Sequence, residues 1–401
     1  MKKHIFSLSV AAVLAAAVSA ISPAYATAQP GTVVDSRPFQ HALPLNATAR
    51  VISYQTQLED GTPTVATATV YEPTAAWRGK GPRPTVVFPP GTRGQGDQCA
   101  PSRAHLGIGS VTTTPAGVSL NINYEYQLYQ YAAAKGMRVV APDLIGLGTP
   151  GHHTYVNTRE QAQAVLDAAR AAVPAGHPVG FAGYSQGGGA AAAAGEYAGL
   201  YAPELNVKGT YAGAAPASLM EVMKAVDGSM IVHVLGYALN GFGERNPELL
   251  SAISENFNER GQEFLRTAAQ SCVADSALTW GGTRTSELTK TGESFYDLAM
   301  RLPAIRQVLE SQKLGVHKPN APMYIATSPN DDITPYPQAQ ALAGDYCRQG
   351  ATVLFHATPG TNASPGSAVP HSHPFFHNIP QGLDYLEARF NDQPAPSNCV
   401  S

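Results

Sequence analysis

A serine set between glycines is the first feature of the chain that could carry covalent chemistry. Residues 183–187 read Gly-Tyr-Ser-Gln-Gly, which fits the pattern G-x-S-x-G. The apolar residues 178–183 favour a buried strand, and the alanine-rich residues 188–200 favour a helix. In that context the pattern predicts a nucleophile elbow, a turn so tight that neighbouring side chains would collide. We take Ser185 as the candidate nucleophile; the alternative is a glycine-rich turn with a surface serine.

An orienting acid is the next requirement, because a serine reacts only when a base takes its proton and an acid holds that base in place. In folds with this elbow, the acid follows a late strand and the histidine follows the last one. The apolar run 323–327 predicts such a strand, and Asp331 and Asp332 come after it. Adjacent side chains point apart, so only one of them reaches the histidine. We favour Asp331 as the acid and expect Asp332 to serve as a cap or turn residue.

Histidines gather where the base is expected. His371, His373 and His377 follow the last strand-like run of the chain. We favour His371 as the base, ahead of His373 and then His377. A metal site built from the three histidines is the alternative, which we rank lower because the elbow already requires a histidine here. Two earlier histidines, His152 and His153, follow another strand. They could line the mouth of the site, but we favour the alternative that they are exposed loop side chains.

Fixed N–H donors must face the oxyanion that forms during acyl transfer. In a nucleophile elbow, one donor is the backbone N–H of the residue after the nucleophile, which here is Gln186. A second donor comes from the loop after an early strand, and the apolar run 85–88 leads into the glycine-containing loop 91–94. We favour Thr92 as this second donor, with Arg93 as the next candidate.

Alternating strand and helix signals indicate the fold that positions these groups. Short apolar runs alternate with helical stretches as far as residue 213, and strand signals return after residue 320. This alternation predicts a mostly parallel sheet with helices on both faces. The elbow narrows the prediction to an α/β fold of the α/β-hydrolase type.

A helical block interrupts this alternation. Residues 217–310 contain no convincing strand, and the apolar side chains at 219–226 repeat with the period of a helix. Residues 230–239, 248–269 and 294–312 also resemble helices. We expect this block to be an inserted lid or cap that lies over the sheet and shapes an acyl pocket; the alternative is a helical subdomain that serves stability alone. The hydrolase core then consists of residues 27–216 and 311–401.

The first residues resemble an export signal rather than part of the fold. Lys2 and Lys3 precede a mostly apolar stretch that ends in an A-x-A motif, so we expect a signal peptide at 1–26 and a secreted product. We favour cleavage after Ala26, and cleavage after Ala28 is the alternative. No later run of about 18 apolar residues occurs, which argues against a transmembrane segment. The chain has 26 Lys and Arg against 29 Asp and Glu and no basic cluster, so we expect no nucleic-acid partner.

Four cysteines lie beyond this signal. They are Cys99, Cys272, Cys347 and Cys399. An even number in an exported chain predicts two disulfides, and three pairings are open. Buried free thiols are the alternative. The absence of a C-x-x-C motif gives no support to a metal or redox site.

Several of these stretches together resemble the secretory lipase family, which includes the Candida antarctica lipase A type. They are Gly-Tyr-Ser-Gln-Gly-Gly at 183–188, Pro-Gly-Thr at 90–92 with Cys-Ala-Pro-Ser at 99–102, and Asp-Asp-Ile-Thr-Pro at 331–335. The resemblance covers roughly residues 35–400. It implies an α/β-hydrolase with a helical lid that cleaves triacylglycerols and simpler esters.

The resemblance also bears on individual residues. It implies Asp331 as the acid and, by spacing from Phe390, His371 as the base. It further implies the disulfide pairs Cys99–Cys272 and Cys347–Cys399.

The expected activity is hydrolysis of carboxylic esters. Ser185 attacks the acyl carbonyl, His371 moves the proton, Asp331 orients His371, and water then releases the acyl group. We expect a lipid or ester substrate, transient contact with a lipid surface, and no metal or organic cofactor. An envelope acyltransferase with the same three residues is the alternative enzyme, and a binding protein on an inactive scaffold is the non-enzymatic alternative.

Overall fold

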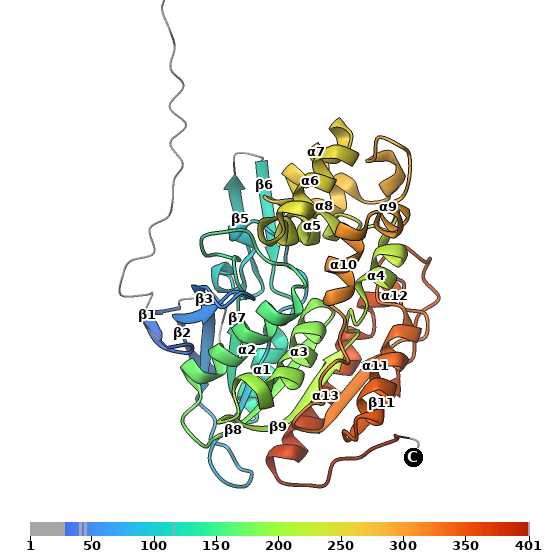
Figure 1. The fold of residues 1–401 in the computed structure, drawn as a ribbon. Helices are drawn as coiled ribbons and strands as arrows, with labels where there is room; N and C mark the ends of the chain where they lie inside the picture. The colour runs from blue at the N-terminus through green and yellow to red at the C-terminus, as the bar shows by residue number, and fades with distance from the viewer. Residues whose placement is uncertain (1–28, 40–41, 44–45, 115–116, 400–401) are drawn as a thin grey trace, which may run out of the picture.

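A large mixed sheet forms the centre of the protein. The computed structural model describes residues 29–39, 42–43, 46–114 and 117–399, so the predicted signal peptide lies outside the described residues. Within them, a nine-stranded sheet has the order β1-β2-β3-β7-β4-β8-β9-β10-β11 (Figure 1). Neighbouring strands are antiparallel from β1 to β7 and parallel from β7 to β11. The strands are β1 (Val33–Pro38), β2 (Ala47–Gln57), β3 (Pro63–Pro73), β4 (Thr85–Val87), β7 (Arg138–Pro142), β8 (Pro178–Tyr184), β9 (Asn206–Gly213), β10 (Met323–Thr327) and β11 (Val353–Ala357).

Helices cover both faces of the parallel part of this sheet, which explains why its strands have uninterrupted apolar sequences. Every residue of β8 is buried. One face packs against α1 (Tyr126–Ala134) and α13 (Phe375–Phe390). The other packs against α2 (Thr158–Ala172), α3 (Gln186–Tyr201) and α11 (Tyr336–Arg348). The protein therefore has the α/β fold with a mostly parallel central sheet that the sequence predicts.

Helices also make up the segment between β9 and β10. They gather above one end of the sheet and bury an apolar cluster of their own that includes Met223, Tyr237 and Phe264 (Figure 1). These elements are α4 (Leu219–Val226), α5 (Val234–Arg245), α6 (Pro247–Asn256), α7 (Glu259–Ala268), α8 (Val273–Trp280), the 3-10 helix η3 (Thr285–Glu287), α9 (Phe295–Arg301) and α10 (Pro303–Ser311). That this helical segment acts as a lid or cap remains a prediction.

The long helices expected in this segment are each divided. The expected helix 248–269 is α6 followed by α7, because the chain is extended at Phe257 and Asn258, and the Asn258 side chain caps α7 by accepting the Gly261 N–H. The expected helix 294–312 is α9 followed by α10, because Pro303 occupies the first turn of α10, where its missing N–H costs no bond.

A small hairpin lies outside the main sheet. Its strands, β5 (Gly109–Thr114) and β6 (Gly117–Ile122), pair antiparallel and follow the short 3-10 helices η1 (Asp97–Cys99) and η2 (Pro101–Arg103). This hairpin is not among the elements predicted from the sequence. In the described part of the chain, no helix is both long enough and apolar enough to cross a membrane.

Candidate active site

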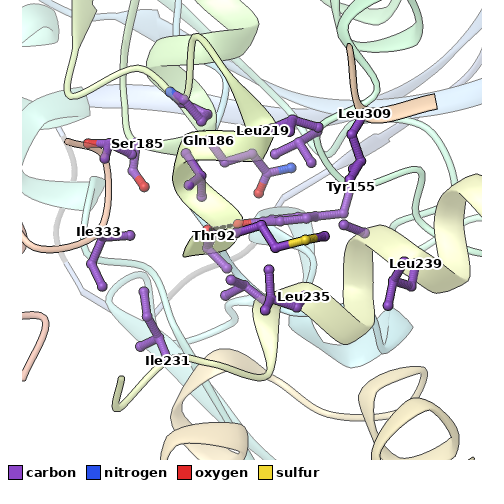
Figure 2. A pocket seen from close by; sticks show the side chains of 17 residues that line it. Thr92, Tyr155, Ser185, Gln186, Leu219, Ile231, Leu235, Leu239, Leu309 and Ile333 are labelled. Atoms are coloured by element: carbon purple, nitrogen blue, oxygen red, sulfur yellow. Dashed lines mark hydrogen bonds between the residues drawn. The ribbon is translucent and has the colours of Figure 1, made fainter. Parts of the chain in front are cut away.

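The turn between β8 and α3 holds Ser185 in a strained conformation. Its φ of 57° and ψ of −126° lie where residues other than glycine rarely occur, at a cost of about 1–3 kcal/mol. The turn is tight because a Cβ at Gly183 would collide with the carbonyl of Gly187, and a Cβ at Gly187 would collide with the carbonyl of Pro89. This strand, turn and helix have the form of the predicted elbow, and the Ser185 side chain lies at the edge of a cavity (Figure 2).

Three predicted side chains meet in a continuous line of contacts. Ser185 Oγ lies 2.9 Å from His371 Nε2. His371 Nδ1 lies 2.9 Å and 3.0 Å from the two carboxylate oxygens of Asp331. Asp331 also accepts the backbone N–H groups of Ile333 and Thr334, at 3.0 Å and 2.8 Å. These distances suit transfer of a proton from the serine to the histidine.

The surroundings of His371 favour its cationic form. Burial lowers the pKa of His371, but the nearby Asp331 carboxylate, aided by Asp332, outweighs burial and raises the pKa above its ordinary value. The imidazolium formed when His371 takes the serine proton is thereby stabilised.

The alternative residues lie in different places. Asp332 does not bind the imidazole; its carboxylate accepts the backbone N–H groups of Ala368 and His371, at 2.9 Å and 3.1 Å, and so holds α12 (Val369–Ser372). Asp332 is thus a cap, as expected. His373 and His377 are exposed, and their rings stand beside each other.

Thr92 lies in a loop next to the elbow, where the neighbouring Gly91 approaches the carbonyl of Tyr184. Its hydroxyl is 2.7 Å from the hydroxyl of Tyr155, and its carbonyl accepts the Tyr124 hydroxyl at 3.0 Å. The next residue, Arg93, turns its buried guanidinium away from Ser185 to form an ion pair with Glu125. Glu125 also accepts the N–H of Gly91 at 2.8 Å, so this ion pair fixes both ends of the loop. Thr92, unlike Arg93, lines both cavities that reach Ser185, and its role as the second donor remains a prediction.

His153 belongs to the site, although its place in the sequence favours an exposed loop residue. It is buried, and burial lowers its pKa to about 4, so the ring is neutral at pH 7. Its Nδ1 donates to the carbonyl of Ile145 at 2.9 Å, which leaves Nε2 to accept the Gln186 side-chain amide at 2.8 Å. His153 thus holds the residue after Ser185. The expectation was wrong because loop 143–157 folds inward beneath α5, which local sequence does not reveal; His152 remains part-exposed.

Two cavities meet at Ser185, and both also reach Thr92 and Ile231. The first, of about 40 Å³, runs beneath the helical segment. Figure 2 shows Leu219, Leu235 and Leu309, from α4, α5 and α10, around this cavity. The second, of about 280 Å³, lies on the His371 side and is lined by Tyr124, Tyr184, Val273, Ala368, Phe375 and Phe376, among others. An acyl carbonyl bound at Ser185 could therefore extend apolar groups in two directions.

The cysteines form two disulfides, Cys99–Cys272 and Cys347–Cys399, which is the pairing that the resemblance implied. The first joins η1, close to the Thr92 loop, to the start of α8. Among the described residues, none of the cysteines is free, and no group of His, Cys, Asp and Glu is arranged to hold a metal ion.

Comparisons with known proteins agree with this fold. The profile of the family described as Secretory lipase matches residues 113–398. A relative from Mycobacterium tuberculosis (strain CDC 1551 / Oshkosh), named Probable inactive lipase MT1628, is 26% identical over 83% of this chain and 74% of its own length. Secreted triacylglycerol lipase LIP4 of Malassezia globosa is 26% identical over 74% of this chain and 64% of its own length, so the chain spans less than two thirds of that protein.

Solved structures share the fold at low identity. Candida antarctica lipase A in its closed state superposes with a TM-score of 0.76 at 20% identity, over 94% of this chain and 86% of that one. The ligand-bound rice cell wall degrading esterase LipA from Xanthomonas oryzae gives 0.71 at 20% identity, over 92% of this chain and all of that one. Since the family profile covers more than half of the sequence, the chain belongs to the secretory lipase family.

Proposed function

We propose that this protein is a secreted serine hydrolase of carboxylic esters, with triacylglycerols as its most fitting substrates. The observation that carries the proposal is the line of contacts from Ser185 through His371 to Asp331, placed where two apolar cavities meet. Relatives named triacylglycerol lipases support the choice of substrate. Export is supported by the signal-like residues 1–26 and by the two disulfides.

The reaction proceeds through an acyl-enzyme. Ser185 Oγ attacks the ester carbonyl while its proton passes to His371 Nε2, and Asp331 stabilises the resulting imidazolium. The backbone N–H groups of Gln186, at the start of α3, and of Thr92 bind the oxyanion. When the tetrahedral intermediate collapses, the leaving alkoxide takes the proton from His371. Water, deprotonated by the same histidine, then attacks the acyl-enzyme, and the carboxylic acid leaves as Ser185 regains its proton.

The two cavities divide the substrate between them in this proposal. The cavity beneath the helical segment takes the acyl chain, because aliphatic side chains from α4, α5 and α10 surround it. The cavity on the His371 side takes the alcohol, which needs to accept a proton from that histidine. Residues 217–310 accordingly act as a cap on the core formed by 27–216 and 311–401.

The proposal is tested by comparing three alanine variants on p-nitrophenyl esters from C2 to C16. Ser185→Ala and His371→Ala should each lower kcat/KM by about 10⁴ or more on every ester, since each removes a group that takes part in bond making or proton transfer. His373→Ala is the matched control and should retain nearly all activity, because His373 is exposed and does not contact Ser185.

Labelling by a fluorophosphonate, followed by mass spectrometry of the modified peptide, checks the nucleophile independently of the choice of ester. The wild type should be labelled at Ser185, and His371→Ala should not. A wild-type chain that is neither labelled nor active on any ester would show an inactive scaffold, as the name of the mycobacterial relative states for that protein. Transfer to an added alcohol in preference to water would instead identify an acyltransferase.

A further inference from the structure

The β5–β6 hairpin presents its apolar side to solvent and its polar side to the protein. Side chains alternate between the two faces of a strand, so each face of a hairpin can be identified from its sequence. The exposed side chains on and beside its outer face are Leu106, Ile108, Val111, Val118, Leu120 and Ile122. The buried ones on its inner face are Ser110, Ser119 and Asn121. This is the reverse of the pattern that stabilises a hairpin on a soluble protein.

The inner polar face is fixed by specific contacts. The Ser119 hydroxyl donates to Asp275 of α8 at 2.6 Å, and the Leu120 N–H donates to the same carboxylate at 2.9 Å. The Asn121 amide donates to the carbonyl of Ala100 at 2.9 Å. A shift of one residue would turn the apolar side chains inward but would break these bonds, so the register keeps the apolar face outside.

The hairpin adjoins the mouth of the larger cavity at Ser185. The Arg93 guanidinium donates to the carbonyl of Ile122 at the end of β6, and it lies over the ring of Tyr124 at 4.3 Å. Tyr124 lines that cavity and donates to the carbonyl of Thr92. Val273, at the start of α8, lines the same cavity. The end of β6 and the start of α8, which the hairpin contacts, therefore lie beside residues that line this cavity.

The composition of the hairpin indicates what covers this face. Between Arg103 and Glu125 there is no Asp, Glu, Lys or Arg. A face without charge offers no attraction to anionic headgroups and no ion-pair partner to a protein surface, whereas it matches a surface that is itself uncharged and apolar. The substrate assigned to the adjoining site, a triacylglycerol, forms a surface of that kind.

We propose that the outer face of the β5–β6 hairpin binds the enzyme to the surface of a neutral lipid aggregate, with the entrance to the active site facing the lipid. The lipid is the substrate of the proposed function, on which this identification rests. Binding itself requires no catalysis, because the hairpin contains none of the residues of the reaction.

Flotation of the secreted chain, without residues 1–26 and carrying Ser185→Ala, with triolein droplets measures binding without turnover. In this background, Val111→Thr with Val118→Thr should weaken partition into the droplet layer at least tenfold. Threonine keeps the branched shape that strands favour, so the hairpin is retained.

The matched control is Leu200→Thr with Val316→Thr. Val111 and Val118 are 66% and 73% exposed, and Leu200 and Val316 are 65% and 62% exposed, so both pairs present similar apolar side chains to solvent. Leu200 lies near the end of α3 remote from Ser185, and the control should bind as the parent does.

A second measurement does not depend on weakening the hairpin. Val118→Trp should show a blue-shifted emission with droplets and quenching by brominated triolein. Equal partition of the hairpin variant and the parent, or a tryptophan at 118 that stays in water, would overturn the proposal. So would a wild-type dimer that the hairpin variant dissociates while droplet binding is unchanged, because the face would then bind a second copy.

Hydrolysis of soluble p-nitrophenyl butyrate separates this proposal from the proposed function. With Ser185 restored, the hairpin variant should match the wild type on this ester and lose at least tenfold on triolein emulsion. A wild type that binds droplets through the hairpin yet hydrolyses neither substrate would overturn the proposed function and support the hairpin as a lipid-binding surface.

Discussion

Ser185 lies between two regions that are held in place by different interactions. On one side, loops at the edge of the sheet are fixed by hydrogen bonds, as where Asp331 binds His371 and the backbone N–H groups of Ile333 and Thr334. On the other, the helices between residues 219 and 311 present to the smaller cavity aliphatic side chains such as Leu235, which pack in an apolar cluster and make no hydrogen bonds.

Because hydrogen bonds fix the loops and apolar packing fixes the cavity-lining side chains of the helices, substitutions in the two regions should have different effects on activity. A hydrogen bond weakens within a few tenths of an ångström and a few tens of degrees, so the loop region sets the positions of reacting atoms. Apolar packing tolerates exchanges that conserve volume, so the helical region can vary without loss of the fold. Substitutions in the loops should therefore change the rate on every ester, whereas substitutions in the helices should change which ester is preferred.

The largest contrast is expected between the two adjacent aspartates. Asp331→Asn should lower kcat/KM by about 10⁴ on all esters, because the amide cannot hold the required tautomer of His371 or stabilise its cation. Asp332→Asn should lower it by about tenfold, since Asp332 binds only the backbone of the histidine segment. Steady-state kinetics on p-nitrophenyl butyrate measure both. Equal losses would mean that the two carboxylates share one role and that the assignment of the acid is wrong.

A smaller and more selective effect is expected in the helical region. Leu235→Phe adds volume to the cavity assigned to the acyl chain and should lower activity on C12–C16 esters by about tenfold relative to the C2 ester. Leu249→Phe is the matched control, because Leu249 is buried in the same apolar cluster but lines neither cavity at Ser185. The ratio of long-chain to acetate activity is the measurement. If both variants changed this ratio equally, packing of the helices rather than cavity volume would be responsible.

The smallest effect is expected in the pH dependence. Burial lowers the pKa of His371, but Asp331 and then Asp332 raise it above its ordinary value, and the base must be neutral to act. Activity on a soluble ester should therefore fall as the pH drops through this raised pKa. Asp332→Asn removes one of the raising charges, so at pH 6 the variant should keep about threefold more of its own plateau rate than the wild type. A profile displaced to higher pH would contradict this account.

The raised pKa of His371 also makes the stability of the fold depend on pH. A raised pKa in the folded state means that protonated His371 stabilises the fold. That contribution is complete below the ordinary pKa of histidine and disappears as the pH rises through the folded value. Urea unfolding of the wild type and of His371→Gln, at one pH below the ordinary pKa of histidine and one pH above the raised value, measures this contribution. The difference in the free energy of unfolding between the two proteins should be smaller at the higher pH.

The loop region was the more predictable of the two from sequence. Ser185, Asp331 and His371 were identified because each follows a short apolar strand, and a parallel sheet brings the carboxyl ends of its strands to one edge. Asp332 was expected to be a cap or turn residue, and it does cap a helix, but the backbone N–H groups that it accepts belong to Ala368 and His371, far along the chain, which no local pattern predicts.

Features that depend on long-range packing were not predictable. His153 contacts Gln186 across 33 positions in sequence, and nothing around His153 distinguishes it from an exposed loop histidine. The division of the expected helices at Asn258 and Pro303 had local signals, a capping residue and a proline, which the apolar periodicity concealed. The hairpin at 109–122 was missed because its apolar residues face solvent, so the usual relation between pattern and burial is inverted.

The strained backbone at Ser185 means that a serine at this position lowers the stability of the fold. Glycine adopts its φ and ψ without the penalty, so exchange of this serine for glycine should make the fold more stable by about 1 kcal/mol. In the absence of selection for activity, a substitution here would therefore favour a more stable protein without the serine. Under the proposed function, this loss of stability accompanies the position that Ser185 needs for attack on the ester carbonyl.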